Sequence, residues 1–304
     1  YQSLAKFLPS IEKAGFDVLI CDESHMLKNE KAQITGTVHS ISHLFRHKIL
    51  LSGTAIKNKK EELYTQVELI RPGFFQNKQA LKTATIGGTW HDIQDFYITK
   101  AKHEVLKDLP PLLTSIVELE VEKCPDYNPD TGIAFEDIAA MKSAVAIAKA
   151  SATTEFIKEL LSSSDSAILV FSDSVEVANK IKEELGDNAI LHHGQMSDDT
   201  REKAKSDFQD PNCKQRVFIS TRQSLAVGAT LTRADKVVFS DLAWNCADIE
   251  QATARCHRIG TVNPVNSYWI KAAGNNWDNK VIGILSKKMD LSKKILEGKQ
   301  LTEA

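Results

Sequence analysis

Short apolar runs alternate with stretches of helical periodicity along most of this chain. In the second half the pattern predicts strands at residues 167–171, 189–192, 216–220, 236–240 and 267–270, and helices at 175–185, 247–258 and 276–288. Strands that alternate with amphipathic helices are typical of a parallel sheet covered by helices on both faces. The pattern therefore predicts an α/β fold, with a nearly complete doubly wound domain in the second half.

The first half of the chain shows fewer strands. Residues 17–21 and 48–51 read as buried strands and 61–70 as a helix, whereas the signal from about 72 to 115 is mixed. Residues 124–132 contain two prolines, an asparagine and a glycine, which predicts a loop before a long helical stretch that ends near Leu161. We expect the first half to be a partial domain, residues 1–115, whose missing strands lie upstream, followed by a second domain at 116–304.

Composition narrows the class of protein further. With 42% hydrophobic and 26% charged residues, the 304-residue chain has the composition of a globular protein. The sequence contains no run of 18 or more apolar residues, so we expect no membrane span. Residue 1 is Tyr and no leader follows, so we expect an internal piece of a longer chain. The five cysteines are scattered singly, without the spacing of a zinc or redox site. A net charge of −2 means that any nucleic-acid contact must depend on local patches and backbone amides.

Two acidic residues end the first predicted strand. Asp22 and Glu23, followed by Ser24 and His25, stand where an open parallel sheet binds its ligands, at the carboxyl end of a strand. An Asp can hold Mg²⁺ there while a Glu orients or deprotonates an attacking water. A solvated turn after a strand is the alternative interpretation.

Hydroxyl-rich segments follow several other strands. Ser52, Gly53 and Thr54 come directly after 48–51, where hydroxyls can join a hydrogen-bond network, although this is also a common turn composition. After residues 216–220, a segment that includes Thr221, Gly228 and Thr230 can bring backbone N–H groups near phosphates. His193 and Gly194 follow 189–192 in a similar way. Plain connections between strands and helices are the alternative interpretation.

The predicted helix at 247–258 carries Gln251, Arg255 and Arg258 at spacings i, i+4 and i+7. Residues at these spacings share one face of a helix. Two arginines one turn apart can present planar guanidinium groups to phosphate oxygens. A solvated basic face would show the same spacing.

The order of these motifs resembles that of superfamily-two helicases of the Snf chromatin-remodelling type. D-E-S-H is followed by L-S-G-T, V-F-S, H-G, S-T…G-A-T-L-T…A-D and Q-A-T-A-R-C-H-R-I-G, with Trp244-Asn245 before the last motif. Lys102–Pro111 resembles the family's segment between lobes. The L-S-G-T motif and the E-L-Y-T-Q segment at 62–66 look most like the annealing-helicase branch. The resemblance covers nearly the whole chain.

This resemblance implies RecA-like parallel sheets, with one complete C-terminal lobe and a partial N-terminal lobe, that bind ATP and Mg²⁺. Asp22 would hold the metal, Glu23 would activate water, and Arg255 and Arg258 would contact the γ-phosphate. The resemblance assigns nucleotide coupling to His25, Ser52, Gly53, Thr54 and Gln251. It assigns the DNA side to Ser172, His193, Gly194, Thr221, Gly228 and Thr230. The implied partner is double-stranded or branched DNA, and the implied location is the cytoplasm of a prokaryote or the nucleus of a eukaryote.

The chain departs from the family pattern at several points. No G-x-x-x-x-G-K-[ST] phosphate loop occurs, so we expect it upstream and expect these 304 residues alone to be inactive as an ATPase. The usual Pro after S-G-T is Ala55, and the usual Gln after H-R-I-G is Thr261. An RNA or DNA helicase that separates strands, or a non-catalytic DNA- or partner-binding module, are the competing interpretations.

Overall fold

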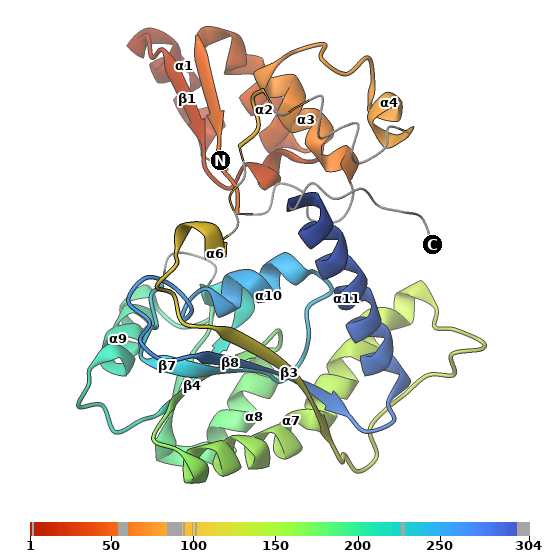
Figure 1. Ribbon diagram of the computed structural model, residues 1–304, viewed down its shortest axis with the longest axis vertical. Coiled ribbons are helices and arrows are strands. Elements are labelled where there is room, and N and C mark those ends of the chain that lie inside the picture. Colours follow the sequence, from red (N-terminus) through yellow and green to blue (C-terminus); the bar gives the residue numbers. More distant parts are fainter. Residues whose placement is uncertain are drawn as a thin grey trace. The chain divides into compact units, whose positions relative to one another are not determined.

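A computed structural model describes all residues except 2, 54–59, 84–92, 94, 99, 101, 226–228 and 297–304. The chain divides into two compact units (Figure 1). Unit 1 comprises residues 1–100 with 288–304, and unit 2 comprises residues 101–287. No helix among the described residues combines the length and apolar character that a membrane span requires.

Unit 1 is built on two parallel strands, β1 (Val18–Cys21) and β2 (His47–Leu50). Its helices are α1 (Leu4–Ala14), α2 (Gln33–Ile41), α3 (Leu63–Ile70) and α4 (Lys78–Thr83), with 3-10 turns at Ser24–Leu27, Ser42–Leu44 and Lys60–Glu62. Helix α1 ends at Gly15, whose φ of 63° is left-handed and suits glycine. The two strands lie where the hydrophobic pattern predicted them.

Among the described residues, a buried cluster covers one face of the small sheet of unit 1. Cys21 on β1 is buried with Leu27, Val38 and Leu69, which come from the following turn and from α2 and α3. Every second residue points to the opposite face. There Val18, Ile20 and Ile49 are 46%, 60% and 46% exposed. These three side chains are apolar, as is ordinary in the strands of parallel sheets.

Unit 2 contains a six-stranded parallel sheet in the order β3-β8-β7-β4-β6-β5. The strands are β3 (Leu112–Leu119), β4 (Ala167–Ser172), β5 (Ala189–His192), β6 (Val217–Thr221), β7 (Ala234–Phe239) and β8 (Val265–Ala272). The helices are α6 (Lys102–Val105), α7 (Ile138–Ser163), α8 (Val175–Leu185), α9 (Asp198–Gln209), α10 (Cys246–Thr253) and α11 (Asn276–Leu296), with 3-10 turns at Phe135–Asp137, Gly186–Asn188 and Arg222–Leu225. Helix α11 begins in unit 2, and its residues from 288 onward are assigned to unit 1.

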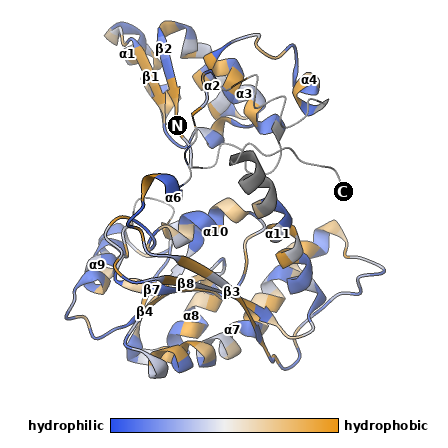
Figure 2. Ribbon diagram, in the orientation of Figure 1, coloured by the Kyte–Doolittle hydropathy of each residue, from blue (hydrophilic) through white to orange (hydrophobic). Residues whose placement is uncertain are grey.

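Helices cover both faces of the six-stranded sheet (Figure 1). Leu169 and Phe171 of β4 pack with residues of α9, α10 and α11, whereas Ile168 and Val170 pack with α7 and α8. Successive side chains of a strand point to opposite faces, which explains why all six residues of β4 are buried. Both polar and apolar residues occur along α7 and α8 (Figure 2), and apolar residues of both helices pack against the sheet. The α/β fold predicted from the pattern is confirmed.

The predicted domain boundary between residues 115 and 116 falls inside a strand. β3 runs through it and pairs with β8 over its full length, from Leu112 opposite Val265 to Leu119 opposite Ala272. The chain instead divides between residues 100 and 101. The pattern missed β3 because it is an edge strand whose residues are mostly exposed, so its periodicity is weak.

Candidate active site

The acidic pair lies directly after β1, in a tight turn. The Asp22 Oδ1 atom accepts a hydrogen bond from the Glu23 backbone N–H at 2.8 Å. Glu23 has a φ of 49°, a left-handed conformation that few residues with a side chain adopt. Both side chains are exposed at this end of the strand. The turn thus directs two carboxylates away from the sheet, and backbone strain of this kind is often found at functional sites.

A buried histidine connects this turn to the segment after β2. The His25 Nδ1 atom lies 3.1 Å from Glu23 Oε2 and 3.1 Å from Ser52 Oγ. His25 is only 5% exposed, and the adjacent Ser24 donates a hydrogen bond to Gln66 Oε1 at 3.0 Å. The structure therefore brings Glu23, His25 and Ser52 into one cluster. Gly53 follows as an exposed residue, and Thr54 lies outside the described residues.

The acids at this turn have the chemistry of a magnesium site that a nucleotide completes. Among the described residues, no three His, Cys, Asp or Glu side chains gather closely enough to hold a metal alone. Mg²⁺ usually keeps several waters and takes only one or two carboxylates together with substrate phosphates. The exposed carboxylate of Asp22 matches that requirement, so the residues present fit the ion.

The arginine motif adopts a different structure from the one predicted. Helix α10 ends at Thr253, and Arg255 and Arg258 lie in turns beyond it, so the prediction that they share a helical face with Gln251 is wrong. The Arg255 carbonyl accepts a hydrogen bond from Leu231 N–H at 2.8 Å instead of continuing a helix. Gln251 remains half-buried in the helix itself. At Arg255 a hydrogen bond from a distant residue therefore takes the place of a helical one.

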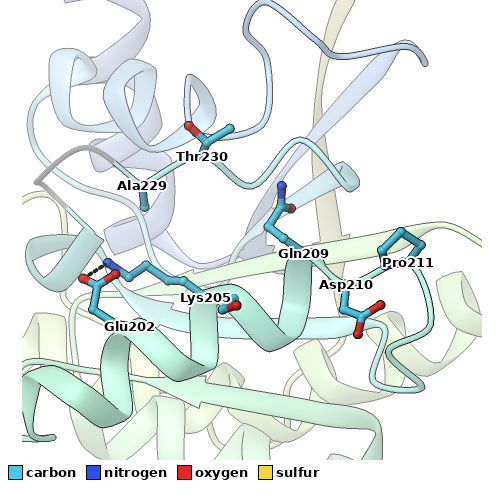
Figure 3. A pocket seen from close by; sticks show the side chains of 8 residues that line it. Glu202, Lys205, Gln209, Asp210, Pro211, Ala229 and Thr230 are labelled. Carbon is cyan, nitrogen blue, oxygen red and sulfur yellow. Dashed lines mark hydrogen bonds and ion pairs between the residues drawn. The ribbon is translucent and has the colours of Figure 1, made fainter.

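One predicted phosphate contact and one predicted DNA contact are neighbours in the structure. The Arg258 guanidinium donates a hydrogen bond to the Thr230 hydroxyl at 2.9 Å. Thr230 also borders an open hollow of about 570 Å³ next to α9 (Figure 3). The hollow is lined by Glu202, Lys205, Ser206, Gln209, Asp210, Pro211, Ala229 and Thr230. Because Lys205 pairs with Glu202, the lining has no excess of positive charge that would select a phosphate.

The side chain of Ser172, predicted to contact DNA, is fully buried. Its hydroxyl donates to Asp241 Oδ2 at 2.5 Å, and Asp241 also accepts from the backbone N–H of Asp173 at 3.0 Å. The Arg222 guanidinium pairs with Asp241 at 3.0 Å and with Asp173. Burial raises the pKa of the Asp241 carboxyl, but Arg222 and the Ser172 hydroxyl outweigh it, and the pKa is lowered. The Ser172 hydroxyl therefore belongs to a buried hydrogen-bond network at the strand ends.

A second buried network lies under the segment after β6. The His192 Nδ1 atom is 3.0 Å from Ser220 Oγ and 3.1 Å from Ser224 Oγ, and Thr221 donates to Ser224 at 3.0 Å. Burial lowers the pKa of His192 to about 4, so the ring is neutral. Thr221 is largely buried, which leaves its side chain little access to a DNA strand. Of the other predicted DNA residues, His193 is half-buried, Gly194 is exposed, and Gly228 lies outside the described residues.

Comparison with known proteins places the chain in a family. A model for the SNF2-related domain matches residues 1–164, more than half of the 304 residues. The chain belongs to the SNF2-related family. A second model, for the helicase conserved C-terminal domain, matches residues 151–260 of this SNF2-related chain.

Several relatives of this SNF2-related chain are similar over most of its length. It is 27% identical to the human DNA annealing helicase and endonuclease ZRANB3, over 96% of this chain and 31% of that protein. It is 30% identical to SWI/SNF-related matrix-associated actin-dependent regulator of chromatin subfamily A-like protein 1 of Xenopus laevis, over 86% of this chain and 31% of that protein. The chain thus spans about a third of the length of these relatives. A solved structure of the C-terminal part of the Fun30 ATPase domain superposes on this chain with a TM-score of 0.50 and 14% sequence identity. The match covers 64% of this chain and 100% of the Fun30 chain, and at this identity it is evidence for the fold only.

The sequence motifs of this SNF2-related chain did not include Arg222, Asp241 and His192, which form the buried networks of unit 2. Arg222 and Asp241 each follow a strand, as the predicted residues do, and His192 ends one. Their position after apolar runs was a usable signal, but nothing in the sequence pairs Arg222 with a carboxylate that lies 19 residues away. Their roles depend on which strands are neighbours, and that is a property of the sheet order.

Proposed function

We propose that this chain carries the catalytic acids and arginines of an ATP-driven motor that moves along double-stranded or branched DNA. The cluster of Glu23, His25 and Ser52, beside the exposed Asp22, is the observation that carries the proposal. Membership of the SNF2-related family supports the ATPase activity. Similarity to a protein named as a DNA annealing helicase supports DNA as the partner. The activity belongs to the full-length protein, of which this chain carries a part of the site.

The proposed chemistry assigns a separate task to each acid. Asp22 would hold Mg²⁺, which supplies positive charge to the β- and γ-phosphates when it is bound. Glu23 would accept the proton of the water whose oxygen attacks the γ-phosphorus, while the bond to the ADP oxygen breaks. His25 holds the carboxylate of Glu23 at 3.1 Å, so it orients the base and connects it to Ser52. Arg255 and Arg258 would stabilise the charge that develops on the transferred phosphoryl group.

The DNA side of the proposal involves fewer residues than the sequence suggested. Thr230 and Gly194 are exposed and His193 is half-buried, so these three are open to a phosphate backbone. Ser172 and Thr221 are buried, so we assign them to the support of this surface. Contacts of this kind bind DNA by its backbone and do not read its sequence. The proposed motor therefore binds DNA with strong salt dependence and little sequence preference.

Two assays on the full-length protein test the proposal. We expect ATP hydrolysis that duplex or branched DNA stimulates and RNA does not, and that Glu23→Gln abolishes with little effect on DNA binding. We also expect displacement of the third strand of a triplex, which reports movement along a duplex. Efficient unwinding of a long blunt duplex without triplex displacement would favour a strand-separating helicase. DNA binding without any stimulated hydrolysis would favour a non-catalytic binding module.

A further inference from the structure

His257 of unit 2 forms hydrogen bonds with both ends of the segment that leads into this unit, at Lys102 and at Pro110. The chain passes from unit 1 to unit 2 between residues 100 and 101, and Lys102 follows at the start of α6. The Lys102 ammonium donates to the His257 carbonyl oxygen and lies 3.4 Å from His257 Nδ1. Eight residues later, the Pro110 carbonyl lies 2.7 Å from His257 Nε2. The entry segment is therefore fastened to a residue about 150 positions further along the chain.

The hydrogen bonds of His257 indicate which of its ring nitrogens carries the proton. A carbonyl can only accept, so His257 Nε2 carries the proton that bonds Pro110, and Nδ1 is left as an acceptor that faces the ammonium of Lys102. Burial lowers the pKa of His257, although the bond to Pro110 opposes it, and the charge of Lys102 lowers it further. The pKa of Lys102 is lowered as well, mainly by partial loss of water around its ammonium, which Cys256 opposes and the positive charge of Arg258 reinforces. A neutral His257 thus accepts an ammonium group close to the arginine motif.

The carbonyl that Lys102 binds belongs to the segment that carries the two arginines. This segment leaves the helix at Thr253, so its carbonyls need partners from elsewhere. The Arg255 carbonyl is bound by Leu231 N–H, the next carbonyl is bound by the Thr261 hydroxyl, and the His257 carbonyl is bound by Lys102. The donors to the Arg255 and His257 carbonyls therefore come from distant parts of the chain, whereas the carbonyl between them is bound within its own turn, by Thr261 and by the Arg258 N–H. Among these donors only Lys102 comes from the entry segment, and it is the only one with a full charge.

We propose that Lys102 is a positioning residue that holds the Arg255–Arg258 segment in its working conformation and ties it to the chain entering unit 2. The inference rests on the proposed function, since it assigns a purpose to the arginine segment. Lys102 acts through the backbone of His257 and does not itself touch the nucleotide. Loss of its ammonium would leave the His257 carbonyl without its charged donor, and Arg258 is the next residue along the chain. Movement of the arginines would weaken a contact made in the transition state more than ATP binding.

The test compares three variants of the full-length protein. Lys102→Met removes the ammonium and keeps an unbranched side chain, Lys102→Arg keeps a charged donor, and Lys107→Met removes an exposed lysine five residues away as a control. For Lys102→Met we expect kcat of DNA-stimulated hydrolysis to fall about tenfold, as for loss of one charged hydrogen bond, with the KM for ATP and the Kd for DNA changed less than about twofold. Lys102→Arg should recover most of that loss, and Lys107→Met should match the parent protein.

Amide hydrogen exchange provides a readout that does not depend on activity. Peptides covering residues 254–261 should exchange faster in Lys102→Met than in the parent protein, and should be restored by Lys102→Arg. Unchanged kcat together with unchanged exchange overturns the inference. Weaker DNA binding with kcat retained also overturns it, and makes Lys102 a phosphate contact. If the parent protein itself shows no DNA-stimulated hydrolysis, the proposed function fails, and the exchange experiment alone decides whether Lys102 positions the segment.

Discussion

A buried ion pair in unit 2 provides a sharp test of how this fold is held together. Lys149 of α7 and Asp278 of α11 are 1% and 3% exposed, and their charged atoms are 2.9 Å apart. Lys149 also donates to the Ile270 carbonyl at 3.1 Å, and Asp278 accepts from the Ala272 N–H at 2.8 Å. The pair therefore joins α7 and α11 to each other and to the end of β8.

Asp278→Asn removes the negative charge and keeps the size of the side chain. It leaves the buried Lys149 ammonium without the carboxylate that it is hydrogen-bonded to, and breaking a buried pair in this way costs about 3–5 kcal/mol. With a urea m-value of about 2 kcal/mol/M, the unfolding midpoint should fall by about 1.5–2.5 M. The double variant Lys149→Met/Asp278→Leu should recover much of this loss, because apolar residues of similar volume replace buried pairs at little cost.

Urea unfolding of the 304-residue chain followed by tryptophan fluorescence measures this effect. Trp269 and Trp277 are buried in unit 2, so their emission reports the unit that holds the pair. Asp165→Asn is the matched control, because the Asp165 carboxylate is fully exposed and its loss should leave the midpoint unchanged. A loss below about 1 kcal/mol for Asp278→Asn, or a double variant as unstable as the sum of both single variants, would refute the reasoning.

Three further predictions concern the site. In the full-length protein, Arg258→Ala should lower kcat of DNA-stimulated ATP hydrolysis by about 10³ or more while DNA binding is largely kept. Arg258→Lys should also lose this hydrolysis, because an ammonium cannot replace the planar guanidinium. A variant that keeps kcat but loses DNA affinity would assign Arg258 to the DNA side. The purified 304-residue chain should release no phosphate from ATP above background, because its sequence has no phosphate loop, and measurable DNA-stimulated release would contradict this. The pKa of His192 is about 4 in the folded chain and about 6.5 in the unfolded chain, so the unfolded state binds the extra proton and stability falls as the pH drops below about 6.5. Urea unfolding should show that the free energy of unfolding falls by about 2 kcal/mol between pH 7 and pH 5. This fall should be absent in His192→Asn, and a fall of the same size in that variant would assign it to other groups.

The sequence by itself determined the class of fold and the places where chemistry is found. Burial leaves a short-range signal, because a strand covered on both faces must be apolar at consecutive positions, as in residues 167–171. Polar residues that follow such runs, such as Asp22, Glu23 and Ser52, stand at the carboxyl ends of strands whatever the rest of the chain does. The motif order then indicated the family, which the comparisons confirmed.

Only the tertiary structure decided which of these residues point outward and which are covered. Ser172 and Thr230 look alike in the sequence, yet one is buried on Asp241 and the other is exposed beside Arg258. The edge strand β3 was missed because most of its residues are exposed, so only its pairing with β8, about 150 residues away, shows that it is a strand.

The end of α10 was misjudged for the same reason. Helical spacing continued through Arg255 and Arg258 in the sequence, but Leu231, Thr261 and Lys102 supply donors to the carbonyls that a longer helix would have used. Local propensity differs between helix and turn by only fractions of a kcal/mol per residue, roughly. The hydrogen bonds from Leu231 and Lys102 therefore outweigh it, and these two donors come close to the segment only once the chain is folded.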